Sequence, residues 1–555
     1  MPTDNEIARS VEPRPIGTIA GDLGLQPSHW RAYGTDVAKV DPAVLRAPRP
    51  RSADNRLILV SAITPTPAGE GKTTTSIGLA QGLARIGESV CLALREPSLG
   101  PSFGMKGGAT GGGRSQVIPR ERINLHFTGD FHAITSAHNL LAAILDNHIY
   151  WGNQLRIDPR RVLWRRVLDM NDRALRNVLV GLGGHKQGVP RESGFDITAA
   201  SEVMAMLCLA ENENDLRARI DRLLVGFSYD GEPVTAERLN ASGAMLALLR
   251  DALWPNLVQT LEGVPAFVHG GPFANIAHGC NSVIATRMAT HLADYAVTEA
   301  GFGFDLGAEK FFDIKCRKAH FDPAAVVLVA TLRALKMHGG AEKHQLTRPD
   351  EARVRDGLPN LDKHIENIHH FGKNPVVALN RFADDTDAEI DIVRRRCEEL
   401  GVAFATSEHH AKGGEGAESL ARAVVEQASA NQPFKPLYEL EDSVPNKILN
   451  VAKVMYGARD IVLTKDAQRD LEDIRHLGYS NLPICIAKTP ASLSDDPKLR
   501  GRPDDFDVTV RSIQINAGAG FLVVLTGDIL RMPGLPRKPL AEQIDLRDGE
   551  IAGMS

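Results

Sequence analysis

The sequence predicts an α/β fold, with a parallel sheet in a large N-terminal domain and two smaller α/β domains after it. An apolar run of strand length at residues 57–63 passes through a Pro- and Gly-rich turn at 64–75 into an apolar helical pattern at 76–86. Several later apolar runs also end in Gly-rich polar loops, which is typical of parallel sheets. The chain has 555 residues, which is too long for one ordinary domain.

Composition excludes several classes of function. Hydrophobic residues make up 43% of the chain, as in globular proteins, and no apolar run reaches membrane-spanning length. The 64 basic and 69 acidic residues are intermixed, so no basic surface for nucleic acid is predicted. The six cysteines are scattered and the first six residues are polar and acidic. We therefore expect a cytoplasmic protein without nucleic-acid or membrane partners.

Residues 57–86 have the order that a phosphate-binding P-loop requires: strand, Gly-rich loop, Gly-Lys-Thr and helix. Backbone N–H groups would face the phosphates, Lys72 would neutralise the outer ones, and Thr73 would bind Mg²⁺. The pattern usually opens with a glycine where this chain has Thr66. The alternative is a Gly-rich turn with a surface lysine, which the flanking strand and helix disfavour. The predicted nucleotide-binding residues are Thr66, Pro67, Ala68, Gly69, Glu70, Gly71, Lys72 and Thr73.

A second strand, at residues 89–94, suggests a βαβ unit with parallel strands. Arg95 and Glu96 follow it, and Lys106 lies in a Gly-rich stretch at 104–113. By composition alone this stretch is typical of a flexible linker. We expect these residues beside the strand of the P-loop, where open α/β sheets bind ligands. That position favours a substrate loop over a linker.

Residues 123–150 predict a short strand, a turn and a helix. His126 and Asp130 lie at the turn and are candidates for acid–base chemistry. Single histidines more often have structural roles, and the spacing here matches no defined zinc site. The following segment, residues 151–262, is predicted to be largely helical.

The remaining strands set the expected domain organisation. Runs at 265–269, 295–300 and 326–330 continue the first sheet, and each ends near polar or Gly-rich residues. Charged residues after 349 suggest a boundary. A second α/β unit holds strands at 374–382 and 402–406, and a third holds strands at 484–486 and 520–525. The predicted domains are therefore 1–350, 351–445 and 446–555.

Segments 66–73, 104–113 and 329–340 are similar to the nucleotide loop and two signatures of the formate–tetrahydrofolate ligase family, also called 10-formyltetrahydrofolate synthetase. The resemblance extends from about residue 40 to 540. It implies that ATP, formate and tetrahydrofolate give ADP, phosphate and 10-formyltetrahydrofolate through formyl phosphate. It also implies a cytoplasmic homotetramer activated by a monovalent cation, K⁺ or NH₄⁺.

The resemblance suggests roles for the candidate residues. Lys72 would neutralise the transferred phosphoryl group, and Arg95 would grip formate or its acyl phosphate in a bidentate manner. Glu96 would orient Arg95 or hold the monovalent cation. Lys106 and its glycine neighbours would form an anion-binding nest.

The flat pterin ring needs aromatic neighbours, and Phe302 and Phe382 match the stacking phenylalanines of the family. His410 stands where the family has tryptophan, so we expect weaker folate binding here. The other departures from family sequence include Phe304, Thr110 and Arg114. Two alternatives to the family's reaction stay open: a related P-loop ligase that activates a carboxylate for another amine acceptor, and a non-enzymatic nucleotide switch.

Overall fold

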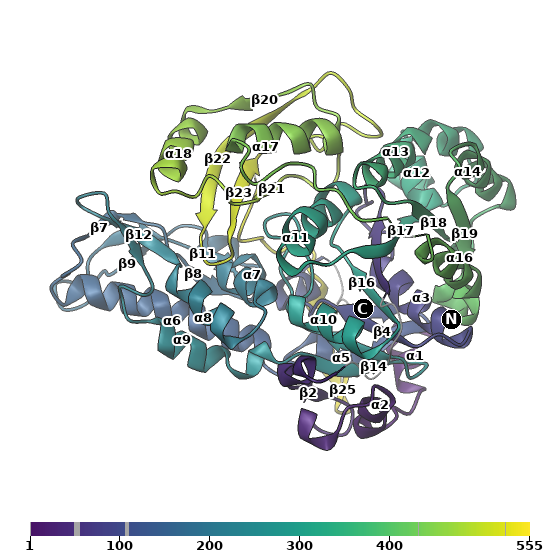
Figure 1. Cartoon of the computed structure of the whole chain (residues 1–555), viewed down its shortest axis with the longest axis horizontal. Coiled ribbons are helices and arrows are strands. Elements are labelled where there is room, and N and C mark those ends of the chain that lie inside the picture. The colour runs from purple at the N-terminus through teal and green to yellow at the C-terminus, as the bar shows by residue number, and fades with distance from the viewer. Residues whose placement is uncertain (1, 49–55, 106–109, 431, 528, 555) are drawn as a thin grey trace.

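The computed structural model describes residues 2–48, 56–105, 110–430, 432–527 and 529–554. A large, mostly parallel sheet forms the body of the molecule, and a smaller sheet near the C-terminus lies above it in Figure 1. The predicted α/β class is therefore confirmed.

Seven strands of the large sheet run parallel to one another. In order across the sheet they are β15 (Pro265–Val268), β4 (Val90–Leu94), β16 (Tyr295–Glu299), β3 (Arg56–Ala62), β17 (Pro323–Ala330), β18 (Pro375–Asn380) and β19 (Ala403–Ser407). Antiparallel strands extend the sheet beyond β15: β14 (Asn256–Thr260), β2 (Ala38–Val40), β1 (Trp30–Ala32), β6 (Ser115–Ile118) and β5 (Gly111–Gly112).

Both faces of the sheet are covered, which explains why its central strands are continuous apolar runs. Along β3, Leu57 and Leu59 join one hydrophobic core, whereas Ile58 and Val60 join the core on the opposite face. This alternation follows from the two-residue period of a strand. The helices of the second core include α3 (Lys72–Arg85) and α16 (Glu418–Ala428), and those of the first include α10 (Val283–Leu292) and α13 (Glu351–His370).

The strand order corrects two predictions. β4 does not lie beside β3, because β16 forms hydrogen bonds with both and separates them. Local sequence predicted that β3 and β4 are parallel, but it does not say which distant strand enters between them. Secondly, residues 351–445 do not form a sheet of their own, since β18 and β19 continue the large sheet beyond β17. The expected boundary at residue 350 therefore does not separate two sheets.

The segment predicted to be largely helical, residues 151–262, contains helices, short strands in small sheets and, near its end, strand β14 of the large sheet. Strand β7 shows why the pattern was missed, because Pro159 and two arginines interrupt its apolar alternation. The strands are β7 (Ile157–Val162), β8 (Arg166–Leu168), β9 (Val178–Val180), β10 (Arg191–Ser193), β11 (Phe195–Ile197), β12 (Leu224–Ser228) and β13 (Pro233–Thr235), and the helices are α7 (Glu202–Leu209), α8 (Glu213–Asp221) and α9 (Ser242–Leu249).

The C-terminal region has its own four-stranded sheet, in the order β20-β22-β23-β21. The predicted strands at 484–486 and 520–525 correspond to β21 and β23, whereas β20 and β22 were not predicted. The elements are β20 (Asp460–Leu463), β21 (Ile484–Ala487), β22 (Asp507–Asn516), β23 (Phe521–Thr526), α17 (Val444–Val451) and α18 (Lys465–His476). The division of the chain into three domains stays a prediction.

Residues 120–150 form two helices, α5 (Arg120–Asn124) and α6 (Asp130–Tyr150), so the short strand predicted there is wrong. Phe127, at φ +42°, lies in the turn between them, a backbone conformation incompatible with a strand. The remaining helices and strands are α1 (Asp4–Arg9), α2 (Ile16–Asp22), α4 (Leu99–Phe103), α11 (Arg317–Ala319), α12 (Leu332–His338), α14 (Asp387–Glu399), α15 (His409–Lys412), β24 (Asp545–Arg547) and β25 (Glu550–Ala552).

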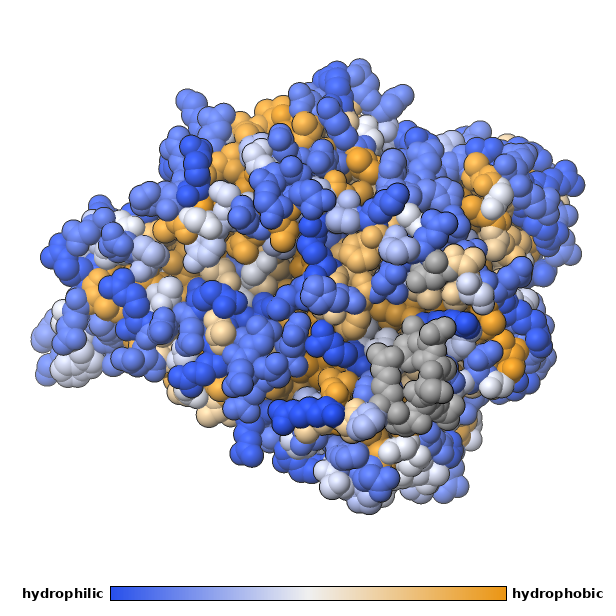
Figure 2. Space-filling view, in the orientation of Figure 1, coloured by the Kyte–Doolittle hydropathy of each residue, from blue (hydrophilic) through white to orange (hydrophobic). Residues whose placement is uncertain are grey.

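Hydrophilic residues predominate on the face shown in Figure 2. Among the described helices, none is both long enough and apolar enough to cross a bilayer. All six cysteines are buried free thiols, as their scattered positions in the sequence suggested.

Candidate active site

The loop after β3 leads directly into α3. The N–H of Gly69 donates to the carbonyl of Thr66 at 2.9 Å and closes a turn, with Gly69 at φ +82°. Gly71 precedes the helix at φ +72°, a conformation that favours glycine. A β-carbon on Gly71 would lie 2.8 Å from Nδ2 of Asn380. The predicted strand, turn and helix are thus present, with Lys72 as the first residue of α3.

Glu70 supports this loop from inside. Its carboxylate is buried, and Oε1 accepts a hydrogen bond from the N–H of Thr66 at 2.7 Å. The hydroxyl of Thr331, the residue after β17, donates to Oε2. These two partners turn the carboxylate toward the loop and β17. Glu70, one of the predicted nucleotide-binding residues, therefore holds the loop in shape.

Glu299, the last residue of β16, links the loop after β3 to the end of β4. The hydroxyl of Thr73 donates to Oε2 of Glu299 at 2.8 Å. Nη2 of Arg95 lies 3.8 Å from the other oxygen, Oε1. Oε1 is buried and accepts no hydrogen bond within the described part of the chain. Thr73 and Arg95 were predicted from the sequence, but the carboxylate that joins them was not.

Arg95 is held in place by groups from two other strand ends. Nη1 donates to the carbonyl of Pro272, which follows β15, at 3.4 Å. A β-carbon on Gly301 would lie 3.0 Å from Nη1, so the absence of a side chain there makes room for the guanidinium. The side chain remains 22% exposed. A partly exposed guanidinium held in this way can meet a carboxylate or an acyl phosphate.

Glu96 is buried and does not contact Arg95 in any described interaction. Burial, together with repulsion from Asp130, raises the pKa of Glu96 well above its ordinary value, whereas Lys39 opposes the shift. Oε2 of Glu96 is buried without a hydrogen-bond partner among the described residues. The carboxylate beside Arg95 is therefore that of Glu299. The sequence had suggested Glu96 for orienting Arg95.

Asp130 begins α6 and forms a buried ion pair. Nζ of Lys39 lies 2.7 Å from Oδ1, and Nδ2 of Asn256 donates to Oδ2 at 2.8 Å. Both members of the ion pair are almost fully buried. His126, in the turn before α6, is exposed. The structure therefore separates the two predicted acid–base residues, one in a closed ion pair and the other facing solvent.

Several groups that hold the site were missed by sequence reasoning. The carbonyl and hydroxyl of Thr64 contact His338 at 2.8 Å and His364 at 3.0 Å, and Nδ2 of Asn360 donates to the same hydroxyl at 3.1 Å. Asn360 and His364 are four residues apart in α13, which places both on one helix face. That spacing was a usable signal. The sequence signal for Lys39 was weaker: it is a single charged residue between apolar neighbours.

The family comparison agrees with this geometry. A sequence model of the formate–tetrahydrofolate ligase family matches residues 2–555, which is nearly the entire chain. The chain belongs to this family.

Formate–tetrahydrofolate ligases join formate to tetrahydrofolate at the expense of ATP, in one-carbon metabolism. The carboxyl ends of the parallel strands suit such a reaction. They bring together a P-loop-like turn, the hydroxyl of Thr73, the carboxylate of Glu299 and the guanidinium of Arg95. This membership disfavours another amine acceptor and a non-enzymatic switch.

The predicted tetrahydrofolate residues follow three strands of the ligase. Phe302 comes after β16 at φ +58°, and Phe382 comes after β18, with the guanidinium of Arg333 4.1 Å from the centroid of its ring. His410 lies in α15, after β19, and is exposed. Among the described residues, no ring contact joins any two of these three side chains. Lys106, the remaining predicted residue, lies outside the described residues.

His410 lies against the end of the glycine-rich stretch and the residue that follows it. A β-carbon on Gly113 would lie 2.8 Å from Nδ1 of His410, and the N–H of Arg114 donates to the His410 carbonyl at 2.9 Å. Its neighbour His409 is buried, with its ring between the hydroxyls of Thr75 and Ser407. Burial lowers the pKa of His409 to about 3, so this ring is neutral.

Proposed function

We propose that the carboxyl edge of β4, β16, β3, β17 and β18 is the active site of this ligase. The observation that carries the proposal is the meeting of Thr73, Glu299 and Arg95, which come from three different segments. Open α/β sheets bind ligands at this edge, outside the carboxyl ends of their strands.

The first step is phosphorylation of formate. The phosphates of ATP lie at the N-terminus of α3, where backbone N–H groups and Lys72 offset their charge. Arg95 holds the formate carboxylate in line with the γ-phosphate. A formate oxygen attacks the γ-phosphorus, the bond from phosphorus to the ADP oxygen breaks, and formyl phosphate and ADP result.

In the second step the amine of tetrahydrofolate attacks the formyl carbon. The carbon–oxygen bond to phosphate then breaks, and phosphate leaves with the bonding electrons. Arg95 and Lys106 offset the charge that develops on oxygen. We assign the proton lost by the amine to His126, which faces solvent, whereas Asp130 is paired with Lys39 at the start of α6.

The residues around Thr73 fit a Mg²⁺ ion. Magnesium prefers oxygen ligands and is usually held by one or two protein groups together with substrate phosphates and water. Thr73 offers its hydroxyl, and Glu299 offers a buried oxygen that has no hydrogen-bond partner among the described residues. When bound, the ion neutralises charge on the β- and γ-phosphates.

Glu96 is our proposed ligand for the monovalent cation, K⁺ or NH₄⁺. Its buried carboxyl has an unpartnered oxygen, and a nearby cation would offset the burial that raises its pKa. We also propose that Phe302, Phe382 and His410 bind the pterin, that the domains are 1–350, 351–445 and 446–555, and that the enzyme is a homotetramer.

Substitution of Lys72 tests the assignment of the site. We expect Lys72→Ala to lose at least about a hundredfold in formate-dependent ADP release, because the point charge at the outer phosphates is lost. Release should also stop in the native enzyme when formate or tetrahydrofolate is omitted. Circular dichroism checks the fold, and Lys498→Ala, at an exposed lysine, is the control. A folded Lys72→Ala enzyme with most of its activity would contradict the assignment.

A further inference from the structure

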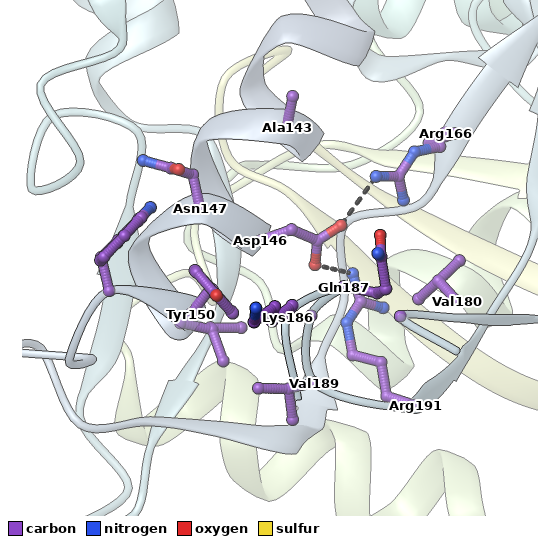
Figure 3. Close-up of a pocket in the computed structure, with 14 residues that line it drawn as sticks. Ala143, Asp146, Asn147, Tyr150, Arg166, Val180, Lys186, Gln187, Val189 and Arg191 are labelled. Carbon is purple, nitrogen blue, oxygen red and sulfur yellow. Dashed lines mark hydrogen bonds and ion pairs between the residues drawn. The ribbon is translucent and has the colours of Figure 1, made fainter. Parts of the chain in front are cut away.

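A cavity lies between the C-terminal end of α6 and the loop that joins β9 to β10 (Figure 3). Its volume is about 460 Å³, in the range of small-molecule sites. Helix α6 has 21 residues, and its first residue, Asp130, is fixed at the large sheet. The lining residues of this helix run from Ala143 to Trp151, so at about 1.5 Å per residue the cavity lies roughly 20–30 Å from that end of the helix. It is therefore a separate place from the proposed active site.

The charged groups that line this cavity are mostly positive. Arg166, Lys186 and Arg191 face a single carboxylate, Asp146. Figure 3 shows Asp146 between the two guanidiniums, with Arg166 on Oδ2 and Arg191 on Oδ1, each at 2.7 Å. After Asp146 neutralises one positive charge, two remain. The charge of the lining thus matches a dianion.

Arg191 provides independent support for a ligand. Its side chain is only 5% exposed, and it lines the cavity. Its Nε is buried and has no hydrogen-bond partner among the described residues. A buried donor without a partner is costly, and an anion in the cavity would satisfy it.

The rest of the lining suits a flat ring. Tyr150 is the last residue of α6 and Trp151 follows it; both line the cavity, with their rings edge to face at 4.9 Å between centroids. Trp151 is 72% exposed, which leaves its indole available for stacking. The amides of Asn147 and Gln187 offer both donors and acceptors to the polar edge of a ring.

We infer that this cavity binds a small molecule in which a planar heteroaromatic ring carries a dianionic group. Two sources share that chemistry: a nucleoside monophosphate, and a folate with the two carboxylates of its glutamate. The ring stacks on Trp151, and the anion binds Lys186 and Arg191. The bound molecule is not a reactant, because it lies roughly 20–30 Å from the end of α6 that meets the large sheet.

The test is a calorimetric titration of the full-length enzyme with AMP and, separately, with folic acid. We expect Lys186→Glu to weaken binding of one probe at least about tenfold, since it removes a charged hydrogen bond and adds repulsion. Lys343→Glu, at an exposed lysine elsewhere, should not weaken it. Lys72→Ala should also leave this binding unchanged, which separates the cavity from the P-loop.

Two further arms test the ring and the anion. Trp151→Ala should weaken the same probe severalfold. If AMP is the probe that binds, adenosine and inorganic phosphate should each bind at least tenfold more weakly than AMP. The inference is overturned if neither probe binds, or if Lys186→Glu binds both as the native enzyme does. It is also overturned if Trp151→Ala changes only the oligomeric state in light scattering, because Trp151 would then be a subunit contact.

Discussion

At the scale of the residue, the position of the Arg95 guanidinium depends on two contacts. Its guanidinium reaches Glu299 at 3.8 Å and the Pro272 carbonyl at 3.4 Å, and both contacts lie on the side of the strand ends. The part of the fork that remains exposed is free to meet a substrate carboxylate. Because a guanidinium is planar and forked, it can form two parallel hydrogen bonds where an ammonium forms one directed contact.

We therefore expect Arg95→Lys to reduce turnover by about tenfold to a hundredfold while the affinity for ATP changes less than about threefold. A hydrogen bond to a charged group is worth about 1.5–3 kcal/mol, which sets that range. Initial rates at saturating ATP and a direct ATP titration measure the two effects. Arg395→Lys, at an exposed arginine, is the matched control. Equal losses in turnover and ATP affinity would count against a role in holding formate.

His410 allows a gain-of-function test. Stacking of a base on an aromatic side chain is worth about 1–3 kcal/mol by alanine substitution, and replacing His by Trp should give a fraction of that. We expect His410→Trp to lower the Michaelis constant for tetrahydrofolate by a few-fold to about tenfold, with little change for ATP or formate. His344→Trp, at an exposed histidine elsewhere, controls for a nonspecific effect of the indole. An unchanged folate constant would remove His410 from the pterin pocket.

Among the residues of the site, those in a contiguous motif were predicted from the sequence, whereas the residues that form hydrogen bonds or ion pairs with the site from distant segments were not. Lys72 and Thr73 follow from a contiguous pattern, so no knowledge of the fold is needed. Glu299 and Lys39 act through residues more than 90 positions away in the chain. Their roles depend on strand order, which local sequence does not contain.

At the scale of elements, the turn between β22 and β23 is held by two helices of the large N-terminal region. Glu202, at the start of α7, accepts hydrogen bonds from the N–H groups of Gly518 and Ala519 at 2.7 and 3.2 Å. Arg219, in α8, donates to the carbonyls of the same two residues. Four hydrogen bonds thus fix one turn of the C-terminal sheet.

Burial raises the pKa of Glu202 from 4.5 to about 7. Below pH 4.5 its carboxyl is neutral in both folded and unfolded chains, and above pH 7 the folded protein must hold a buried charge. The stability that the neutral carboxyl confers is therefore lost as pH rises from about 4.5 to 7.

Glu202→Gln keeps an oxygen for both N–H groups and cannot ionise. On going from pH 5 to pH 8, its free energy of unfolding should rise relative to the native enzyme by about 2–3 kcal/mol. Urea unfolding at the two pH values measures this change. Glu213→Gln, at an exposed carboxylate in α8, should show no such pH dependence. A constant difference at both pH values would show that Glu202 does not titrate between them.

Element types were predicted best where burial is two-sided. The strands β3, β16 and β17 read as apolar runs because both of their faces are covered. Strands β7 and β20 are exposed on much of their surface and have no such run. Tertiary pairing, rather than local pattern, makes them strands.

At the scale of the molecule, a buried ion pair joins the two main sheets. Asp305 follows β16 of the large sheet, and Lys488 follows β21 of the C-terminal sheet. Their charged atoms lie 2.9 Å apart, with side chains 3% and 0% exposed. Because both partners are buried, removal of one leaves the other without its counter-charge in a low-dielectric environment.

We expect Asp305→Asn to lower the free energy of unfolding by about 3–5 kcal/mol, because Lys488 then lacks its partner. The double variant Asp305→Asn with Lys488→Met should recover part of that loss. Denaturant unfolding of both variants gives the coupling between the residues. Asp230→Asn breaks an exposed pair with Arg156 and should cost about 1 kcal/mol or less. Equal effects for the buried and exposed pairs would contradict this role.

The order of strands in the large sheet also affects how the chain is made. During synthesis β3 emerges early, but its two neighbours are β16 and β17. Roughly 230 residues separate Ala62 from Tyr295. At about 5–20 residues per second, a ribosome needs on the order of 10–50 s to supply the first of these neighbours. Throughout that interval the apolar strand that leads to the nucleotide loop has both edges unpaired, so the nascent chain presents a binding site for chaperones until the middle of the sheet closes.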